Sequence, residues 1–236
     1  MEIPRGVIEM TAMGRGIGMP VMRIDAPAMV TGEAKYGTDI IIPGMLHGRI
    51  LRSSFAHARI VHLDVSDALR MPGVHAVVTA ADTPDTQLFA KDYVSFVGQK
   101  IAAVAADSPD LAEEAVHRIH IEYEPLPAVV DVRDAIRPDA PIACEGASLE
   151  EVADVDGTPL SNIARFQEFI AGDVDEGFRE ADVIVEGEFY VPSVHQGHLE
   201  INTSVAQVEA SSGRVVLWSS TQGHFQVRAI TARLLG

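Results

Sequence analysis

A segment near the middle of this chain limits its possible folds to two separate units. Residues 137–162 contain three prolines and several acidic residues, and their apolar residues follow neither helical nor strand spacing. Segments of this composition are typical of exposed connections between domains. We therefore predict folded units at residues 23–136 and 162–236, joined by a linker at residues 137–161.

The beginning of the chain lacks the same periodicity. Residues 1–30 are rich in Gly, Met and Pro, and we predict an extended arm, of which residues 1–22 precede the first unit. Gly14, Gly16 and Gly18 lie in this arm. A glycine turn that cradles phosphate follows a strand and opens a helix. The neighbouring residues form neither, so a flexible arm is favoured over a phosphate loop.

The first unit alternates short strands with one well-marked helix. That helix should begin after Ser108, with Pro109 at its first position, and end near Arg118. Its apolar face is expected to carry Leu111, Ala112, Ala115, Val116 and Ile119. Strands are expected at residues 45–51, 58–63, 74–79, 94–105 (two strands around a glycine) and 120–124, with a short helix at 66–70. This pattern predicts a mixed α and β domain.

The second unit shows a similar mixture. A helix is expected to start at residues 173–178, where an acidic run suits the positive end of the helix dipole. Residues 183–191 alternate like a strand. Residues 203–209 and 215–219 predict a β-hairpin, and apolar residues at helical spacing predict a helix at residues 226–235.

Charge and cysteine content exclude several classes of function. The net charge of −16 and the pI near 4.8 argue against DNA or RNA as a partner, because phosphate binding needs clustered Lys and Arg. The only cysteine, Cys144, cannot form an internal disulfide or hold an iron–sulfur cluster alone. No window has the roughly 20 apolar residues of a membrane span, and no signal peptide is recognisable. We expect a cytoplasmic protein with no membrane partner.

One group of side chains invites a metal-site interpretation. His195, His198 and Glu200 lie close together, and His224 follows later. Their spacing is not the i, i+4 pair of a helical zinc site, and Pro192 precedes them. We favour a polar loop whose histidines lie on the surface or contact another chain. No metal ligand is therefore predicted.

A series of short segments resembles the opening of the large, molybdenum-cofactor-carrying subunits of the xanthine dehydrogenase and aldehyde oxidase family. In family order the segments are 23–27 (RIDAP), 30–39 (VTGEAKYGTD), 43–48 (PGMLHG), 51–60 (LRSSFAHARI), 71–74 (MPGV), 97–104 (VGQKIAAV) and 121–129 (IEYEPLPAV). Each segment alone is modest, but their common order is specific. The resemblance implies an α+β fold in which the first unit is the family's a/b hammerhead domain.

The second unit resembles the start of the family's molybdopterin-binding α/β domain. The matching segments are 172–182 (GDVDEGFREAD), 195–200 (HQGHLE) and 218–223 (WSSTQG). In the family, the glutamine of the last segment approaches the oxo group of the molybdenum centre. The resemblance therefore implies that Gln222 lies near this oxo group, and that Gly223, His224 and Phe225 also contact the cofactor. The alternative for Gln222 is a buried amide that satisfies backbone groups at the strand end.

The resemblance also implies which parts of the site lie outside this chain. The family continues with a Gly-Gly-Phe-Gly-Gly loop, further pterin contacts and a C-terminal glutamate that serves as general base, so no catalytic residue is expected here. The cofactor should be molybdenum–molybdopterin in its cytosine dinucleotide form, completed by a partner chain that carries the remainder of the subunit. Iron–sulfur clusters and FAD are expected only on partner subunits.

The implied function is the oxidative hydroxylation of a small molecule such as an aldehyde, an N-heterocycle or an aromatic thioester. The chain would be the N-terminal portion, or a small split subunit, of the large subunit, and it would be inactive alone. The alternative is a non-catalytic assembly or interaction module that has kept the fold. In either case the second unit should expose apolar surface where the rest of the cofactor domain belongs.

Overall fold

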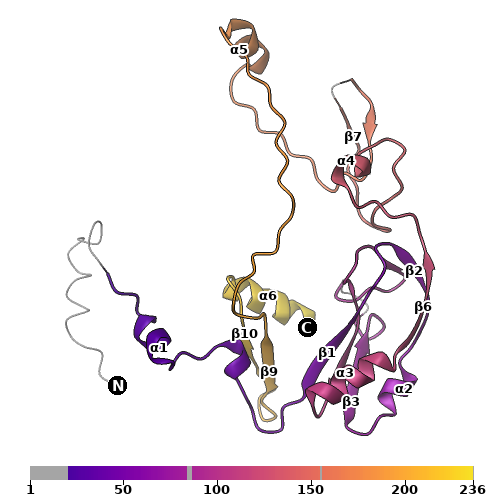
Figure 1. Cartoon of the computed structure of the whole chain (residues 1–236), viewed down its shortest axis with the longest axis vertical. Coiled ribbons are helices and arrows are strands. Elements are labelled where there is room, and N and C mark those ends of the chain that lie inside the picture. The colour runs from indigo at the N-terminus through magenta and orange to yellow at the C-terminus, as the bar shows by residue number, and fades with distance from the viewer. Residues whose placement is uncertain (1–20, 84–86, 155, 236) are drawn as a thin grey trace. The chain divides into compact units, whose positions relative to one another are not determined.

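The computed structural model of the chain describes residues 21–83, 87–154 and 156–235 (Figure 1). Most of the predicted arm, with its three glycines, lies outside the described residues. The last part of the arm differs from the prediction, because α1 (Ala26–Thr31) is a short helix. Pro27 lies in its first turn, and a glycine in the left-handed conformation ends it. These local start and stop signals outweigh the missing helical period.

Contacts group the described residues into two compact units. The larger unit consists of residues 43–193, and the smaller unit combines residues 21–42 with residues 194–235. This grouping divides the chain at other positions than the boundaries predicted from the sequence, which remain predictions. None of the described helices combines the length and the hydropathy that a membrane crossing requires.

Two three-stranded antiparallel sheets form the framework of the larger unit. β5 lies between β1 and β3 in the first sheet, and β2 lies between β4 and β6 in the second. The strands are β1 (His47–Arg52), β2 (Ala58–Asp64), β3 (Val74–Thr79), β4 (Tyr93–Val94), β5 (Lys100–Ala106) and β6 (His120–Pro125). All the strands predicted for the first unit are confirmed, and each has a partner strand.

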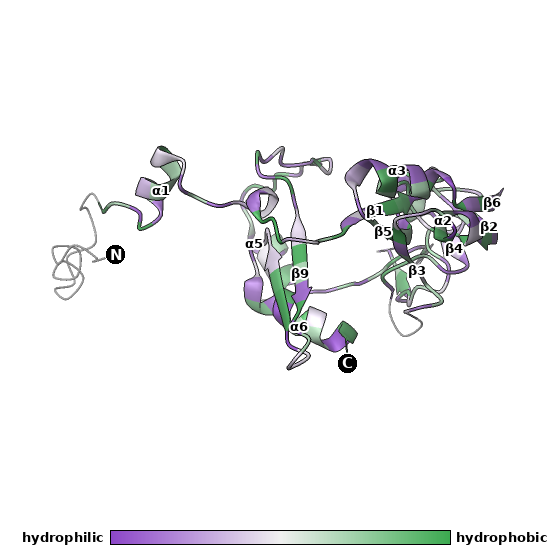
Figure 2. Cartoon of the chain, turned by 90° about the horizontal axis from the view of Figure 1, so that it is seen from below, coloured by the Kyte–Doolittle hydropathy of each residue, from purple (hydrophilic) through white to green (hydrophobic). Residues whose placement is uncertain are grey.

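The core of the larger unit lies on both sides of β5. Successive side chains of a strand point to opposite faces of the sheet. Accordingly, Ala102 and Val104 pack in one cluster with Val116, whereas Ile101 packs in a second cluster with Val94. Figure 2 shows β5 largely in the hydrophobic colour beneath α3. β5 therefore connects the helix layer to the second sheet.

Helix α3 (Pro109–His117) forms where it was predicted and covers the first sheet. Its N-cap is Ser108, whose hydroxyl accepts a hydrogen bond from the Leu111 amide at 3.2 Å. Gly73 lies directly beside this helix start with φ +84°, and a Cβ there would lie 2.7 Å from the Leu111 side chain. The close approach and the left-handed backbone both require glycine. The predicted short helix is also present, as α2 (Ser66–Leu69).

The chain after β6 forms short elements joined by loops. They are α4 (Val132–Ala135), β7 (Val152–Ala153) and β8 (Pro159–Leu160), and β7 pairs with β8. Asn162, with φ 56°, holds the loops together. Its side chain accepts from the Ala143 amide at 2.8 Å and donates to the carbonyls of Ala135 at 2.8 Å and Pro141 at 3.0 Å. The predicted linker thus contains ordered turns.

The last part of the larger unit confirms one prediction and overturns another. Helix α5 (Val174–Glu180) begins where expected, and the Asp173 carboxylate caps it by accepting from the Glu176 amide at 2.8 Å. The strand predicted at residues 183–191 is wrong, because the chain there forms no strand. An alternating pattern gives a strand only where a partner supplies hydrogen bonds, and no described strand pairs with this segment.

The smaller unit is built around a hairpin. β9 (Ser204–Val208) pairs antiparallel with β10 (Val215–Ser219), and α6 (His224–Leu235) follows, so the hairpin and final helix predicted from the sequence are confirmed. The turn is closed by a hydrogen bond from the Gly213 amide to the Glu209 carbonyl at 2.8 Å. Figure 1 shows the indigo stretch around the 3-10 helix η3 (Gly37–Asp39) beside this hairpin.

Candidate functional site

The turn between β10 and α6 carries the predicted cofactor-binding residues. Thr221, Gln222 and Gly223 connect the end of the strand to the start of the helix. The Gly223 amide donates to the Thr221 hydroxyl at 3.0 Å, and the Gly223 carbonyl accepts from the Val227 amide at 2.9 Å. A hydroxyl that bonds the backbone two residues ahead stabilises a tight turn. Gln222 therefore lies between two residues that a hydrogen bond joins, the Thr221 side chain and the Gly223 backbone.

Gln222 is exposed, and its amide makes no hydrogen bond within the described part of the chain. The alternative of a buried amide bonded to the strand end does not match this exposure. Behind Gln222, the first amides of α6 have no partner inside the helix and form its positive end. The turn therefore presents hydrogen-bond donors to solvent, an arrangement suited to an anionic or strongly polar oxygen.

His224 and Phe225 open helix α6 next to this turn. Their rings lie 4.5 Å apart between centroids, and Phe225 is 74% exposed. An aromatic side chain of this exposure at a helix start offers an apolar surface to a neighbouring molecule. All four predicted cofactor-binding residues are thus consecutive and accessible, and their contact with a cofactor stays a prediction.

Glu200 joins three segments of the smaller unit close to this turn. Its Oε1 atom accepts from the Ser220 hydroxyl at 3.0 Å and from the Gly37 amide at 3.5 Å. The Ser220 amide donates to the Thr203 carbonyl at 3.0 Å and so extends the hairpin pairing beyond β10. Sequence reasoning placed Glu200 in a histidine loop and missed its partners. Gly37 and Glu200 are 163 residues apart, so no local pattern could pair them.

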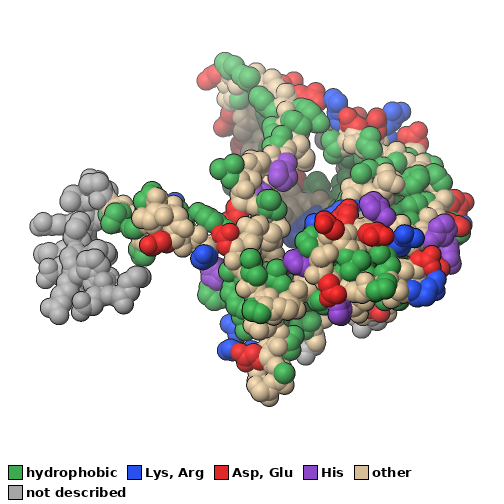
Figure 3. Space-filling view, turned by 60° about the horizontal axis from the view of Figure 1, so that its bottom comes forward, with side chains coloured by type: hydrophobic (Ala, Val, Ile, Leu, Met, Phe, Trp, Pro, Cys, Tyr) green, Lys and Arg blue, Asp and Glu red, His purple; other side chains and the backbone are tan. Residues whose placement is uncertain are grey.

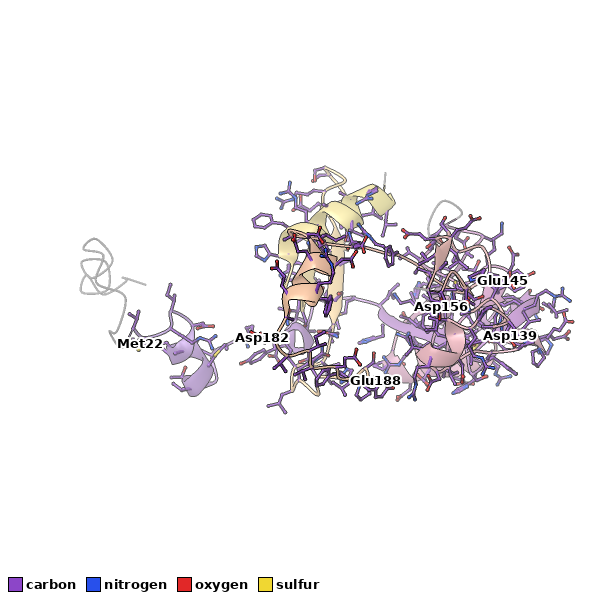
Figure 4. All side chains as sticks on the ribbon, turned by 90° about the horizontal axis from the view of Figure 1, so that it is seen from above. Met22, Asp139, Glu145, Asp156, Asp182 and Glu188 are labelled. Atoms are coloured by element: carbon purple, nitrogen blue, oxygen red, sulfur yellow. The ribbon has the colours of Figure 1, made fainter. Side chains whose placement is uncertain are left out.

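The neighbouring histidines do not form a metal site with Glu200. The His195 and His198 rings stack at 5.3 Å between centroids, and the Gly197 amide donates to His195 Nδ1 at 3.1 Å. Among residues 21–83, 87–154 and 156–235, no three His, Cys, Asp or Glu side chains are placed to hold a metal ion. The acidic side chains labelled in Figure 4 extend from loops without converging: Asp139, Glu145, Asp156, Asp182 and Glu188.

At the opposite end of the hairpin, the turn contains a carboxyl group with a lowered pKa, that of Glu209. Hydrogen bonds from the Arg214 guanidinium and the Ser212 hydroxyl lower the pKa of the Glu209 carboxyl. Both bonds lie within the turn, because Ser212 and Arg214 are its own residues. Glu209 therefore stabilises the turn and takes no part in the Gln222 region.

Two family models match the chain. The model for aldehyde oxidase and xanthine dehydrogenase, a/b hammerhead domain, matches residues 31–127. The model for the molybdopterin cofactor-binding domain matches residues 156–236. The first match contains both three-stranded sheets and α3, and the second contains the hairpin, the Gln222 turn and α6.

Known proteins show similarity over the same range. The chain is 36% identical over 223 residues to a probable xanthine dehydrogenase subunit of Bacillus subtilis, covering 90% of this chain and 28% of that protein. It is 31% identical over 237 residues to the carbon monoxide dehydrogenase large chain of Afipia carboxidovorans, covering 94% and 29%. A crystal structure of Cu,Mo-CO dehydrogenase matches with a TM-score of 0.80 at 31% identity, over 92% of this chain and 29% of that one. This chain spans less than a third of each.

Proposed function

The chain belongs to the aldehyde oxidase and xanthine dehydrogenase family of molybdenum hydroxylases, with its a/b hammerhead domain followed by the start of its molybdopterin-binding domain, and we propose that it forms one wall of a molybdenum–molybdopterin site. Together with the remaining part of that domain, it would support the oxidative hydroxylation of an aldehyde, an N-heterocycle or an aromatic thioester.

The observation that carries this proposal is the free amide of Gln222. It extends from a turn with a fixed backbone, within the segment that matches the molybdopterin-binding model. The residues present fit such a group, because Gln222 and the start of α6 offer donors, whereas the cofactor carries oxo and phosphate oxygens. A hydrogen bond from an amide to an oxo group leaves the metal to its own ligands and fixes its orientation.

These donors suit the chain to binding the cofactor rather than to the redox chemistry itself. The bound cofactor would supply the two-electron redox chemistry, and this chain's residues would hold and orient it. Gln222 would donate to an oxo oxygen, while Gly223 allows the backbone to approach the cofactor and Phe225 shields it from water on one side. The family resemblance assigns the general base to a glutamate in a later segment, so proton transfer would fall to a residue outside residues 221–225.

Exposed apolar side chains support the need for a partner. Figure 3 shows apolar side chains spread between charged ones over the visible face. Within the segments that match the molybdopterin-binding model, Val185 is 88% exposed, Phe189 is 91% exposed and Leu199 is fully exposed. Side chains of this size are normally buried against other elements. We propose that a chain with the remainder of the molybdopterin-binding subunit covers them.

Further partners follow from the relatives and from composition. Several relatives are named as parts of larger assemblies: a xanthine dehydrogenase subunit, a carbon monoxide dehydrogenase large chain and, in Paenarthrobacter nicotinovorans, the gamma subunit of a 6-hydroxypseudooxynicotine dehydrogenase complex. Cys144 is the only cysteine of this sequence and is exposed, so iron–sulfur clusters would belong to partner subunits, and we place FAD there as well by the family resemblance. The cofactor would be the cytosine dinucleotide form, and the assembly would be cytoplasmic.

Molybdenum analysis and a redox-dye assay test the proposal. The chain is purified alone, and then after co-expression with the reading frame that follows it. We expect little molybdenum and no turnover in the lone chain, because a pterin dinucleotide needs donors from several segments. Both properties should appear with the partner chain.

Two outcomes would contradict the proposal. Stoichiometric molybdenum with turnover in the lone chain would show that it is more than one wall of a site. A stable complex that contains neither molybdenum nor activity would favour the alternative, a non-catalytic assembly module that has kept the fold.

A further inference from the structure

We propose that Glu200 is a positioning residue that ties residues 36–39 to the base of the Gln222 turn and thereby fixes the backbone from which the Gln222 side chain extends. The role in catalysis rests on the proposed function. The tie, meaning the two hydrogen bonds that Glu200 accepts, can be measured in the chain without its cofactor. Three observations carry the inference. Glu200 accepts two hydrogen bonds on one oxygen, Gly37 packs closely against its neighbours, and Ser220 lies two residues before Gln222.

The first observation is that a single oxygen, Glu200 Oε1, accepts both hydrogen bonds. One donor is the Ser220 hydroxyl at 3.0 Å, and the other is the Gly37 amide at 3.5 Å. Hydrogen bonds to a charged acceptor are stronger than those between neutral groups. Since both bonds use Oε1, an amide oxygen at the same position can replace the carboxylate. The network therefore depends on an acceptor at this place, and the negative charge strengthens it.

The second observation is the packing of residue 37. A Cβ on Gly37 would lie 2.1 Å from Thr203 Oγ1 and 2.9 Å from Ser220 Oγ, so only glycine fits there. The segment is also held from within, because the Tyr36 amide donates to Asp39 Oδ2 at 2.9 Å. Residues 36–39 thus form a rigid turn that sits directly on β9 and β10 at their Gln222 end.

The third observation links this contact to the functional turn. Ser220 lies two residues before Gln222. Its amide donates to the Thr203 carbonyl and its hydroxyl donates to Glu200, so its backbone N–H and its side chain both have partners. The next residue, Thr221, bonds the Gly223 amide. The residues around Gln222 are therefore held, and the Glu200 side chain extends this support to residues 36–39.

Hydrogen exchange of the full chain, followed by mass spectrometry of its peptides, tests the tie. Glu200→Ala should speed exchange of peptides with residues 36–39 and 219–223 by on the order of tenfold, while strand amides of β9 and β10 keep their protection. Glu200→Gln should restore slow exchange, because its amide oxygen can accept both bonds. The control Glu209→Ala makes the same change at the far end of the hairpin and should affect only the turn there.

Either of two results would overturn the proposal. One is that Glu200→Ala leaves residues 36–39 as protected as in the wild type. The other is that Glu200→Gln exchanges as fast as Glu200→Ala, which would make the effect one of charge alone. If Glu200→Ala unfolds the whole hairpin, Gly37→Ala provides the second variant, because it removes the same contact by a clash and leaves the carboxylate in place.

Kinetics of the enzyme assembled with its partner chain test the catalytic role. Glu200→Ala should lower kcat with little change in KM, and Glu200→Gln should recover most of it. In a chain that already carries Gln222→Ala, the Glu200 substitution should cause no further loss, because Glu200 acts through Gln222. Additive losses would refute the positioning role. If Gln222→Ala alone changes nothing while the exchange results hold, the proposed function fails and the tie remains.

Discussion

Gln222 extends its amide from the point where the chain leaves β10, and its backbone neighbours are fixed by hydrogen bonds. In the assembled enzyme, Gln222→Ala should lower turnover while cofactor content stays nearly intact. A single donor directed at an oxo group stabilises the transition state by about 1–3 kcal/mol. Steady-state kinetics and molybdenum analysis of the same preparation measure both quantities.

The matched control for this prediction is Gln207→Ala, which removes the same amide from β9. Its turnover should equal that of the wild type. Unchanged kinetics in Gln222→Ala, or an equal loss in the control, would remove Gln222 from the site.

At the same scale, the sequence indicates some site residues and hides others. Gln222 is a candidate because it lies in a short segment that resembles the family, and its contact with a cofactor stays a prediction. Glu200 was noticed only as a neighbour of two histidines, and its true partners are Ser220 and Gly37. Resemblance identifies residues one segment at a time, whereas hydrogen bonds between distant segments depend on how the chain folds. The network around Glu200 therefore becomes visible only in three dimensions.

At the scale of elements, β5 is the strand on which the larger unit depends, because its two faces belong to different clusters. Ile101 is completely buried on one of these faces. Ile101→Ala should lower the free energy of unfolding by about 2–5 kcal/mol, since it removes buried methyl groups and leaves a cavity. Urea denaturation followed by circular dichroism measures this loss.

Ile142→Ala makes the same substitution in a loop where the side chain is 43% exposed. It should cost less than 1 kcal/mol, roughly the range of substitutions on the surface. Equal losses in the two variants would mean that β5 does not carry the core of the larger unit.

Most elements with strong local signals were predicted correctly, and the strand predicted at residues 183–191 failed for a physical reason. Ser108 and the proline after it define the start of α3, and a glycine turn defines the β9–β10 hairpin. Residues 183–191 alternate as clearly as any strand but have no partner among the described strands. Periodicity indicates which face of a segment prefers burial, whereas strand formation also needs a neighbour with free backbone groups. That neighbour cannot be deduced from the segment itself.

At the scale of the whole molecule, the exposed apolar side chains of residues 183–199 predict self-association. Light scattering should show a mass above that of the 25.3 kDa monomer at micromolar concentrations. The double substitution Val185→Ser and Phe189→Ser should shift the mass toward the monomer without changing the melting temperature, because both side chains are exposed.

Val61→Ser serves as the control, since Val61 is half exposed on β2 of the larger unit. It should leave the mass distribution unchanged. A monomeric wild-type chain would contradict the prediction, and so would a control variant that dissociates as readily as the double variant.

The construction of the smaller unit from both ends of the sequence has a consequence for synthesis. Residues 21–42 are translated before the whole larger unit, whereas their partners follow after it, and Gly37 precedes Glu200 by 163 residues. At about 5–20 residues per second, translation separates the two by roughly 10–30 seconds. The larger unit can collapse within that interval, since small domains fold in microseconds to seconds. Residues 21–42 therefore reach their native contacts only after the larger unit has had time to fold.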